Sequence, residues 1–191
     1  MNTPQYRAVN FSQTTITELM IPAYANFGGK IHGGIILSLM DKVAYVCSAK
    51  HAGCYCVTAS INVVDFRGPV EVGDLVHLHA SVNYVGTSSI VVGVRVEAEN
   101  IHTGEVRHTN SSYFTMVAMD ENRQPRTVPG LILESKMEVH RYTKTLKRRE
   151  LLKQYKQDIS ELELDTENVN PEKSTTETLL ADQRCIVAVS C

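Results

Sequence analysis

The distribution of apolar residues predicts one largely buried helix in the first third of this chain. In the run Ile35–Cys47, apolar side chains occupy nearly every side of a helix with 3.6 residues per turn. We therefore expect a helix over residues 33–50 that ends near Gly53. Asp41 places a single carboxylate inside the apolar run. Because a buried Asp is uncommon without a partner, this residue needs an explanation.

Other parts of the chain alternate apolar with polar residues, which is typical of half-buried β-strands. In the segment 88–99, every second residue from Ile90 to Val96 is Ile or Val. Strands are expected at residues 14–20, 55–66, 75–85, 88–99 and 106–119. Turn residues lie between several of them, at 73–74, 86 and 103–104.

Strands joined by such short turns pair antiparallel. The pattern therefore predicts an α+β fold, in which a curved antiparallel sheet wraps around one central helix. A single sheet on one helix leaves its edge strands unpaired and part of the helix uncovered. We therefore expect a homo-oligomer, with a dimer as its smallest form.

The segment just before the predicted helix is rich in glycine. Asn26 precedes the pair Gly28–Gly29, and the pair Gly33–Gly34 opens the helix. Glycines at a helix start let a ligand approach free backbone N–H groups closely, where the positive end of the helix dipole favours negative charge. An acyl carbonyl could be polarised there.

Two interpretations of Asp41 stay open. It is either a solvated residue on a polar edge beside Lys42, or a general base or nucleophile in acyl transfer. Gly34 and Asp41 share a helix face but lie roughly 10 Å apart along the axis at about 1.5 Å rise per residue. One carbonyl cannot contact both groups. We therefore expect the carboxylate to come from a neighbouring subunit, so that a two-fold dimer has two composite sites.

The motifs Asn26–Gly29, His32–Gly34 and Met40–Asp41 resemble the signature of the hotdog-fold acyl-CoA thioester hydrolases, which include bacterial broad-range enzymes and the brain-type acyl-CoA hydrolase. The resemblance covers roughly residues 12 to 132, and the later matching segments are 60–66, 69, 72–74, 85–89, 110–118 and 126–129. It implies a hotdog fold and hydrolysis of acyl-CoA to free fatty acid and coenzyme A. It also implies hotdog dimers, often assembled as trimers of dimers.

The resemblance implies roles for the glycine segment and the carboxylate. Asp41 activates water or attacks the thioester itself, Asn26 orients that water or binds the thioester oxygen, and Gly34 N–H completes an oxyanion hole worth about 3 kcal/mol. Gly33 is expected to contact the substrate beside it. The alternative for Asn26 is a simple turn residue, and His32 fits a structural turn residue better than a catalytic base.

Coenzyme A needs backbone donors and cations for its phosphates. The resemblance implies that the donors come from a turn and the cation from Arg126. The residues of the turn are Gly86, Thr87, Ser88 and Ser89. The alternatives are an ordinary strand turn and a solvated arginine. The chain has no phosphate-binding Gly-x-x-x-x-Gly-Lys loop, and we expect no cofactor.

Composition excludes several other classes. The chain has 191 residues, 43% of them hydrophobic, and a net charge of -2, which argues against a nucleic-acid binder. No apolar run approaches the roughly 18 residues of a membrane span, and the N-terminus lacks a signal pattern, so we expect a cytoplasmic protein. The odd count of five cysteines favours reduced thiols. Neither Cys54–Cys56 nor the histidines show zinc-ligand spacing, so no metal is expected.

The expected organisation has four parts. An N-terminal arm covers residues 1–11, the hotdog thioesterase domain 12–132, a basic amphipathic helix 133–157, and an acidic flexible tail 158–191. One alternative function is a non-catalytic hotdog sensor of acyl-CoA or a nucleotide, and another is a hotdog dehydratase. Regulation of a thioesterase by a nucleotide also stays open.

Overall fold

The computed structural model of the chain describes residues 6–165, and their side chains as far as residue 160. Residues up to Leu146 form one compact unit, and the chain from Lys147 onward forms a second. All residues expected at the site lie in the first unit.

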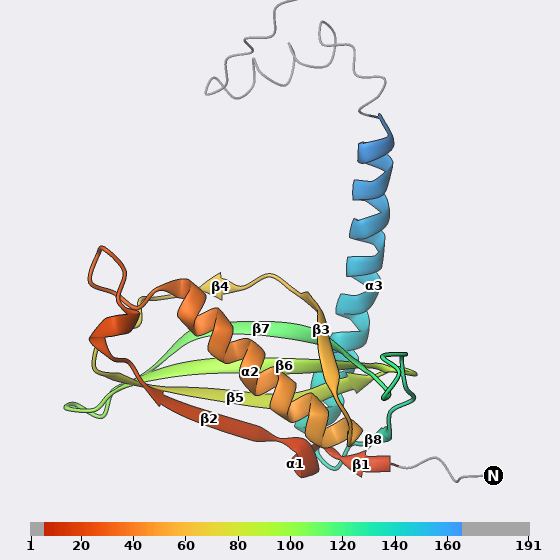
Figure 1. The fold of residues 1–191 in the computed structure, drawn as a ribbon, viewed down its shortest axis with the longest axis horizontal. Helices are drawn as coiled ribbons and strands as arrows, with labels where there is room; N and C mark the ends of the chain where they lie inside the picture. Colours follow the sequence, from red (N-terminus) through yellow and green to blue (C-terminus); the bar gives the residue numbers. More distant parts are fainter. Residues whose placement is uncertain (1–5, 166–191) are drawn as a thin grey trace, which may run out of the picture. The chain divides into compact units, whose positions relative to one another are not determined.

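A six-stranded antiparallel sheet is the centre of the first unit (Figure 1). Five strands follow one another in the order β2-β5-β6-β7-β3, and a sixth, β4, pairs with β7. Their bounds are Thr14–Leu19 for β2, Cys56–Ile61 for β3, Asp65–Phe66 for β4, Asp74–Val85 for β5, Ser89–Asn100 for β6 and Val106–Ala118 for β7. The expected antiparallel sheet is confirmed.

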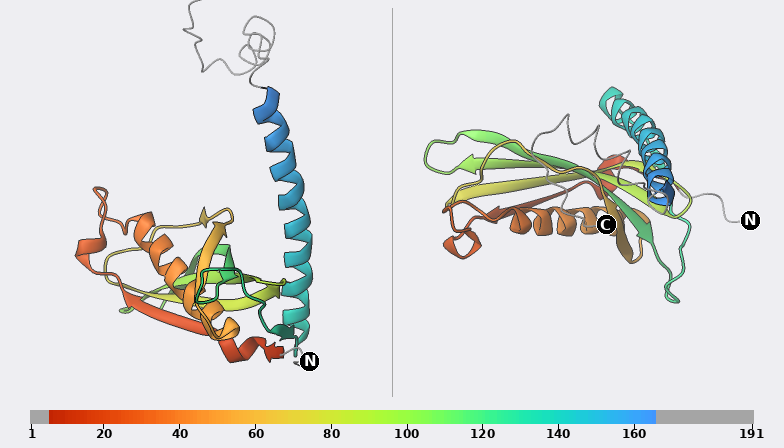
Figure 2. Two further views of the ribbon diagram at one scale, coloured as in Figure 1. Left: turned by 45° about the vertical axis from the view of Figure 1, so that its right-hand side comes forward. Right: turned by 90° about the horizontal axis from the view of Figure 1, so that it is seen from above.

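The helix α2, Gly33–Ala52, lies across one face of this sheet (Figures 1 and 2). It begins at the expected residue and ends two residues later than expected, where Gly53 adopts a left-handed conformation with φ 72°. Its apolar side chains are buried against the sheet. The fully buried core includes Met40, Val43, Cys47, Val76, Leu78, Val92, Val96, Phe114 and Met116. This arrangement of one central helix on a curved antiparallel sheet confirms the hotdog fold.

The strand expected over residues 55–66 is interrupted. It forms β3 and the two-residue β4, and the register of β3 against β7 shifts between Thr58 and Ser60. The extra residue is Ala59, which makes a β-bulge. Alternating sequence patterns do not reveal a one-residue bulge, because both neighbours remain compatible with a strand.

Residues 6–11 of the expected N-terminal arm lie in regular structure. The short strand β1, Tyr6–Ala8, pairs in parallel with β8, Gly130–Ile132, and the helix α1, Val9–Ser12, follows it. A side chain at Gly130 would clash with the ring of Tyr6. Arg7 donates to the carbonyls of Lys50 and His51 and so caps the end of α2. Residues 6–12 are therefore anchored to the core.

The helix α3 spans Lys136–Asp165 and continues from the first unit into the second. It begins with a capping box, in which Glu138 Oε2 accepts from the amide of Ser135 and Ser135 Oγ accepts from the amide of Glu138. It extends eight residues beyond the expected end at 157, so the first part of the expected tail is helical, while residues 166–191 lie outside the described residues. Met137, near the start of this helix, is 58% exposed. Across the described residues, no helix is long and apolar enough to cross a membrane.

Candidate active site

The glycine-rich loop before α2 is closed by Asn26. Its backbone N–H donates to Lys30 O at 2.7 Å, and its Oδ1 accepts from the amides of Gly28 at 2.8 Å and Lys30 at 3.2 Å. The side-chain oxygen of Asn26 therefore stabilises the loop, as expected of a turn residue. Its amide Nδ2 makes no hydrogen bond within the described residues, so this end of the side chain remains able to donate to a ligand.

The first turn of α2 is capped by His32. The ring Nδ1 of His32 accepts from the amide of Gly34 at 2.9 Å, and the carbonyl of His32 accepts from the amide of Ile35 at 2.9 Å. His32 is thus the N-cap of the helix, which agrees with the expectation that it is a structural turn residue. The Gly34 N–H expected in an oxyanion hole is occupied by this cap. The N–H of Gly33 makes no hydrogen bond within the described residues and is the available donor.

Asn26 and Gly33 line the same cavity, which has a volume of about 390 Å³. Apolar side chains also line it, among them Ile36, Phe66 and Val70. A Cβ added at Gly33 would lie 3.1 Å from the Phe66 ring, so glycine keeps the mouth of the helix accessible. The cavity combines amide donors at a positive helix end with an apolar wall, which suits an acyl group. Asp41 does not line it.

Asp41 lies near the middle of α2 and is half-buried. Its Oδ1 accepts a hydrogen bond from Thr58 Oγ1 at 2.6 Å. Thr58 is exposed on β3, which is an edge strand of the sheet. The hydrogen-bond partner of the Asp41 carboxylate is therefore the hydroxyl of Thr58 on a neighbouring strand. Sequence analysis missed Thr58, because a single Thr in a strand is ordinary and no local pattern links it to a residue seventeen positions earlier.

The turn between β5 and β6 carries the residues expected to bind coenzyme A. The amide of Gly86 donates to Ser89 O at 2.7 Å, and the carbonyl of Thr87 accepts from the amide of Val128 at 2.9 Å. Ala118 links the two segments, since its amide donates to Ser88 O and its carbonyl accepts from the amide of Arg126. The structure therefore brings this turn and exposed Arg126 to one place at the sheet.

Two of the described cysteines are buried and unreactive. Burial raises the pKa of Cys47 to about 12 and that of Cys56 to about 11, so both stay protonated thiols near neutral pH. Cys47, Cys54 and Cys56 are free. Within residues 6–160, no three His, Cys, Asp or Glu side chains gather into a group that could hold a metal ion.

The expected site residues thus form three separate groups in one chain. Asn26 and Gly33 share the cavity at the start of α2, and Asp41 pairs with Thr58 at the sheet edge. The turn 86–89 and Arg126 lie together beside Ala118. The carboxylate of one chain therefore does not share a cavity with the amide donors of the same chain.

Comparisons with known proteins identify the family of this chain. Residues 28–105 match the model of the thioesterase superfamily. Protein VdlD of Helicobacter pylori is 47% identical over 133 residues, which cover 70% of this chain and 76% of that protein. The chain belongs to the thioesterase superfamily. The crystal structure of an apo-hexameric acyl-CoA thioesterase is similar to this family member, with a TM-score of 0.77, 38% identity and coverage of 79% of this chain and 97% of that one.

An acyl-CoA hydrolase from Staphylococcus aureus, solved with butyryl coenzyme A and coenzyme A, is also similar to this thioesterase-superfamily chain. The TM-score is 0.73 at 30% identity, with coverage of 82% of this chain and 98% of that one. Further structures of that hydrolase carry Ala in place of an Asn, an Asp or a Thr, which lie fifteen and seventeen residues apart. The same residue types stand at the same spacing here, at Asn26, Asp41 and Thr58.

Proposed function

We propose that this protein hydrolyses acyl-CoA thioesters to free fatty acid and coenzyme A, in composite sites formed by two subunits. The observation that carries the proposal is the separation of the chemical groups in one chain. Asp41 and Thr58 meet at an open sheet edge, whereas Asn26 and Gly33 line a cavity that Asp41 does not reach. A second copy of the chain supplies the missing half of each site.

The edge that carries Thr58 is suited to pairing with a second copy. The strand β3 has β7 as its one neighbour within the described residues, so its outer row of backbone groups is unpaired. Large apolar side chains are exposed on and around this edge. They are Tyr45, Tyr55, Ile61, Val63 and Phe66. Association through β3 would pair the strand edge and bury these side chains in one step.

A two-fold axis that pairs β3 with its own copy makes the two strands antiparallel. The two α2 helices then also run antiparallel. The start of α2 in one subunit is thereby carried toward the part of α2 that holds Asp41 in the other. This arrangement supports a site in which Asp41 and Thr58 of one subunit face Asn26 and Gly33 of the partner subunit.

The proposed reaction is general-base hydrolysis. Asp41 takes a proton from a water molecule, and the hydroxide so formed attacks the thioester carbonyl carbon. The carbonyl oxygen becomes an oxyanion that accepts from the Gly33 amide at the positive end of α2 and from Asn26 Nδ2. Collapse of the intermediate breaks the C–S bond, and the thiolate of coenzyme A leaves with the proton held by Asp41. A nucleophilic role of Asp41, through a mixed anhydride, is the alternative route.

Thr58 gives Asp41 a fixed orientation in this scheme. Its hydroxyl donates to Oδ1, which leaves Oδ2 to accept from the attacking water. Gly34 serves as a second oxyanion donor when the ring of His32 gives up its hydrogen bond to the Gly34 amide. The turn Gly86–Ser89 and Arg126 bind the phosphates of coenzyme A at the sheet.

Mixing two inactive variants tests the composite site. Asp41→Asn and Asn26→Ala are each expected to lose most thiol release from acyl-CoA. When the two are unfolded, mixed in equal amounts and refolded, half of the dimers contain one chain of each kind, and each of these has one intact site. Mixing should therefore restore about a quarter of native activity. Activity that stays at the level of the single variants would place each site within one chain.

The native protein and Lys42→Ala are the controls, since Lys42 is exposed beside Asp41 on the same helix. Acyl-CoAs of graded chain length are used, with free thiol as the readout. A native protein that binds these compounds without releasing thiol would favour the non-catalytic sensor instead.

The proposal extends to assembly and location. The likeness to a hexameric thioesterase supports a trimer of dimers built on the same pair. Free Cys47, Cys54 and Cys56 support a reducing, cytoplasmic location. Regulation by a nucleotide stays a prediction from the sequence.

A further inference from the structure

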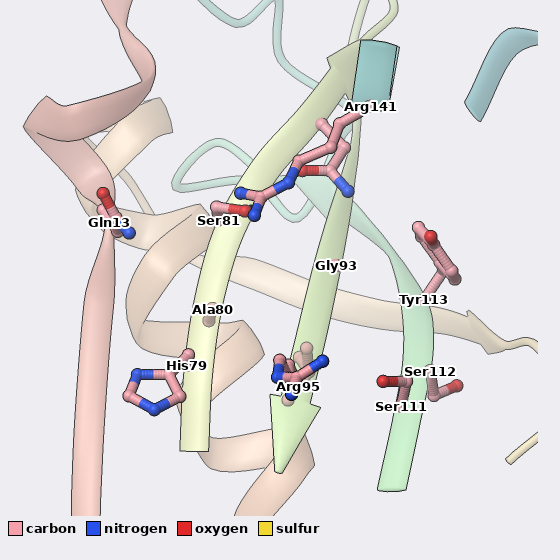
Figure 3. Close-up of a pocket in the computed structure, with 12 residues that line it drawn as sticks. Gln13, His79, Ala80, Ser81, Gly93, Arg95, Ser111, Ser112, Tyr113 and Arg141 are labelled. Atoms are coloured by element: carbon pink, nitrogen blue, oxygen red, sulfur yellow. The ribbon is translucent and has the colours of Figure 1, made fainter. Parts of the chain in front are cut away.

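A second polar cavity lies on the face of the sheet that points away from α2 (Figure 3). Its volume is about 360 Å³, and it is lined by residues of β5, β6 and β7, by Gln13 before β2 and by Arg141 of α3. No carboxylate lines it. The polar and basic side chains that matter below are Ser81, Asn83, Arg95, Ser111, Tyr113 and Arg141.

The floor of this cavity depends on a β-bulge. The register of β5 against β6 shifts between Val82 and Tyr84, so Asn83 is the extra residue. A Cβ at Gly93 would clash with Asn83 Nδ2, which shows that the amide lies directly over this glycine. Bulges of this kind re-aim a side chain, and they are over-represented next to functional sites. Gly93 makes the close approach of Asn83 possible.

Two polar side chains of the floor are nearly buried. Ser81 is 8% exposed and Asn83 is 5% exposed, and Ser81 Oγ donates to Asn83 Oδ1 at 3.1 Å. This bond uses the oxygen of the Asn83 amide. Nδ2 has no partner within the described residues and can donate to a ligand. The Asn83 amide therefore presents N–H donors at the floor of the cavity, and an anionic ligand can accept from them.

Two arginines line the cavity, and one of them, Arg95, is paired with a carboxylate outside the lining. Arg141 sits on a turn of α3 that is fixed to the sheet, because the ring of Tyr142 packs on Tyr84 with centroids 5.6 Å apart. Arg141 is exposed, and its guanidinium is in none of the ion pairs of the described residues. Arg95 donates through Nε to Glu97 at 2.7 Å, and this bond holds the pKa of Glu97 below its ordinary value. The remaining N–H groups of the Arg95 guanidinium are not used by that bond.

We propose that this cavity binds a phosphate dianion, either free phosphate or the phosphate of a small phosphomonoester. Guanidinium groups present planar pairs of donors that match phosphate oxygens, and the amide of Asn83 and the hydroxyl of Ser111 add neutral donors beside them. The volume exceeds that of phosphate alone and leaves room for the organic part of an ester. Because the cavity lies across the sheet from α2, its ligand does not pass through the site of Asp41.

Calorimetric titration of the full chain with sodium phosphate and with glycerol 3-phosphate tests this proposal. Sodium chloride at equal ionic strength corrects for general salt effects. The variant Arg141→Gln removes the unpaired charge, and the matched control Lys144→Gln removes a charge from an exposed position three residues further along the same helix that does not line the cavity. Arg141→Gln should weaken phosphate binding at least tenfold, and Lys144→Gln should leave it unchanged.

A second variant changes the position of Asn83 at the floor of the cavity. Gly93→Ala forces Asn83 out of its position and should also weaken binding at least tenfold. Tighter binding of glycerol 3-phosphate than of phosphate would identify the ligand as an ester, and equal affinity would identify free phosphate. The proposal is overturned if the native protein binds neither compound, or if Arg141→Gln and Lys144→Gln bind phosphate equally. Asp41→Asn should bind like the native protein, so the outcome does not depend on the thioester site.

Discussion

At the scale of single residues, the contact between Thr58 and Asp41 decides how the carboxylate is presented. A hydrogen bond to a charged acceptor at 2.6 Å fixes the carboxylate plane and leaves one oxygen for water. Thr58→Ala removes this bond and leaves Asp41 free to rotate. We expect kcat to fall by about tenfold to a hundredfold, in line with a hydrogen bond to a charged group, which is worth about 1.5–3 kcal/mol. The measurement is thiol release at saturating acyl-CoA.

Thr58→Ser is the matched control for this prediction, since it keeps the hydroxyl and loses one methyl group. It should retain most of the native kcat. A Thr58→Ala variant with native kcat would show that the hydroxyl has no part in orienting Asp41. An equal loss in both variants would point to packing of the methyl group instead.

The hydrogen bond between the His32 ring and the Gly34 amide affects both stability and substrate binding in the proposed site. The ring of His32 occupies the Gly34 amide, so the helix start is capped in the absence of a ligand. His32→Ala removes the cap, which typically costs about 1 kcal/mol of stability for an N-cap residue. If the Gly34 amide is needed as a donor, the same variant keeps or lowers the KM for acyl-CoA while it lowers the melting temperature. A raised KM together with unchanged stability would assign His32 to substrate binding.

At the scale of elements, the buried His51 ties the end of α2 to two other segments. It is fully buried, with Nδ1 3.4 Å from Ser12 Oγ and Nε2 3.2 Å from Pro129 O. Burial lowers the pKa of His51 below its ordinary value of 6.5. The neutral ring donates through Nε2 to the carbonyl and can accept at Nδ1. Protonation would place a charge in this buried position beside the positive Arg7.

This arrangement predicts loss of stability in acid. Between the lowered pKa and 6.5 the unfolded chain binds the proton and the folded chain does not, so stability falls as the pH drops through this range. The slope from His51 is at most about 1.4 kcal/mol per pH unit. Urea unfolding from pH 8 to pH 5, at fixed protein concentration, measures it. His51→Gln keeps a donor toward Pro129 and should show a shallower slope, and an unchanged slope would assign the effect to other groups.

Elements differ in how well the sequence predicts them, and length is the reason. The helix α2 and the strands β5, β6 and β7 repeat their pattern over a dozen or more residues, so their type and approximate bounds follow from periodicity. The three-residue strands β1 and β8 have no room for a period, and their pairing joins residues more than 120 positions apart. The hydrogen bond from Thr58 to Asp41 could not be predicted for the same reason, since it joins two single residues without a repeating pattern. Asp41 was predicted from the apolar helix that surrounds it, and its separation from Gly34 was predicted from the helix rise. A functional role for Asn26 came only from the resemblance.

At the scale of the whole molecule, the open edge at β3 links assembly to activity. The exposed Val63 follows β3 on this edge and is 77% exposed in a single chain. Val63→Asp therefore changes little in an isolated subunit but places a charge in the proposed interface, where an unpaired charge is costly. We expect the variant to dissociate to folded monomers and to lose thiol release, because neither half of the site is complete alone.

The matched control is Ile101→Asp, which introduces the same charge at an apolar residue that is 51% exposed in the turn after β6. It should keep the native assembly and activity. Sedimentation velocity measures the assembly, circular dichroism checks the fold, and thiol release is measured at matched concentrations. A Val63→Asp variant that remains a dimer would place the interface elsewhere. A monomeric variant with native turnover would reject the shared site, because then one chain would hold every group that the reaction needs.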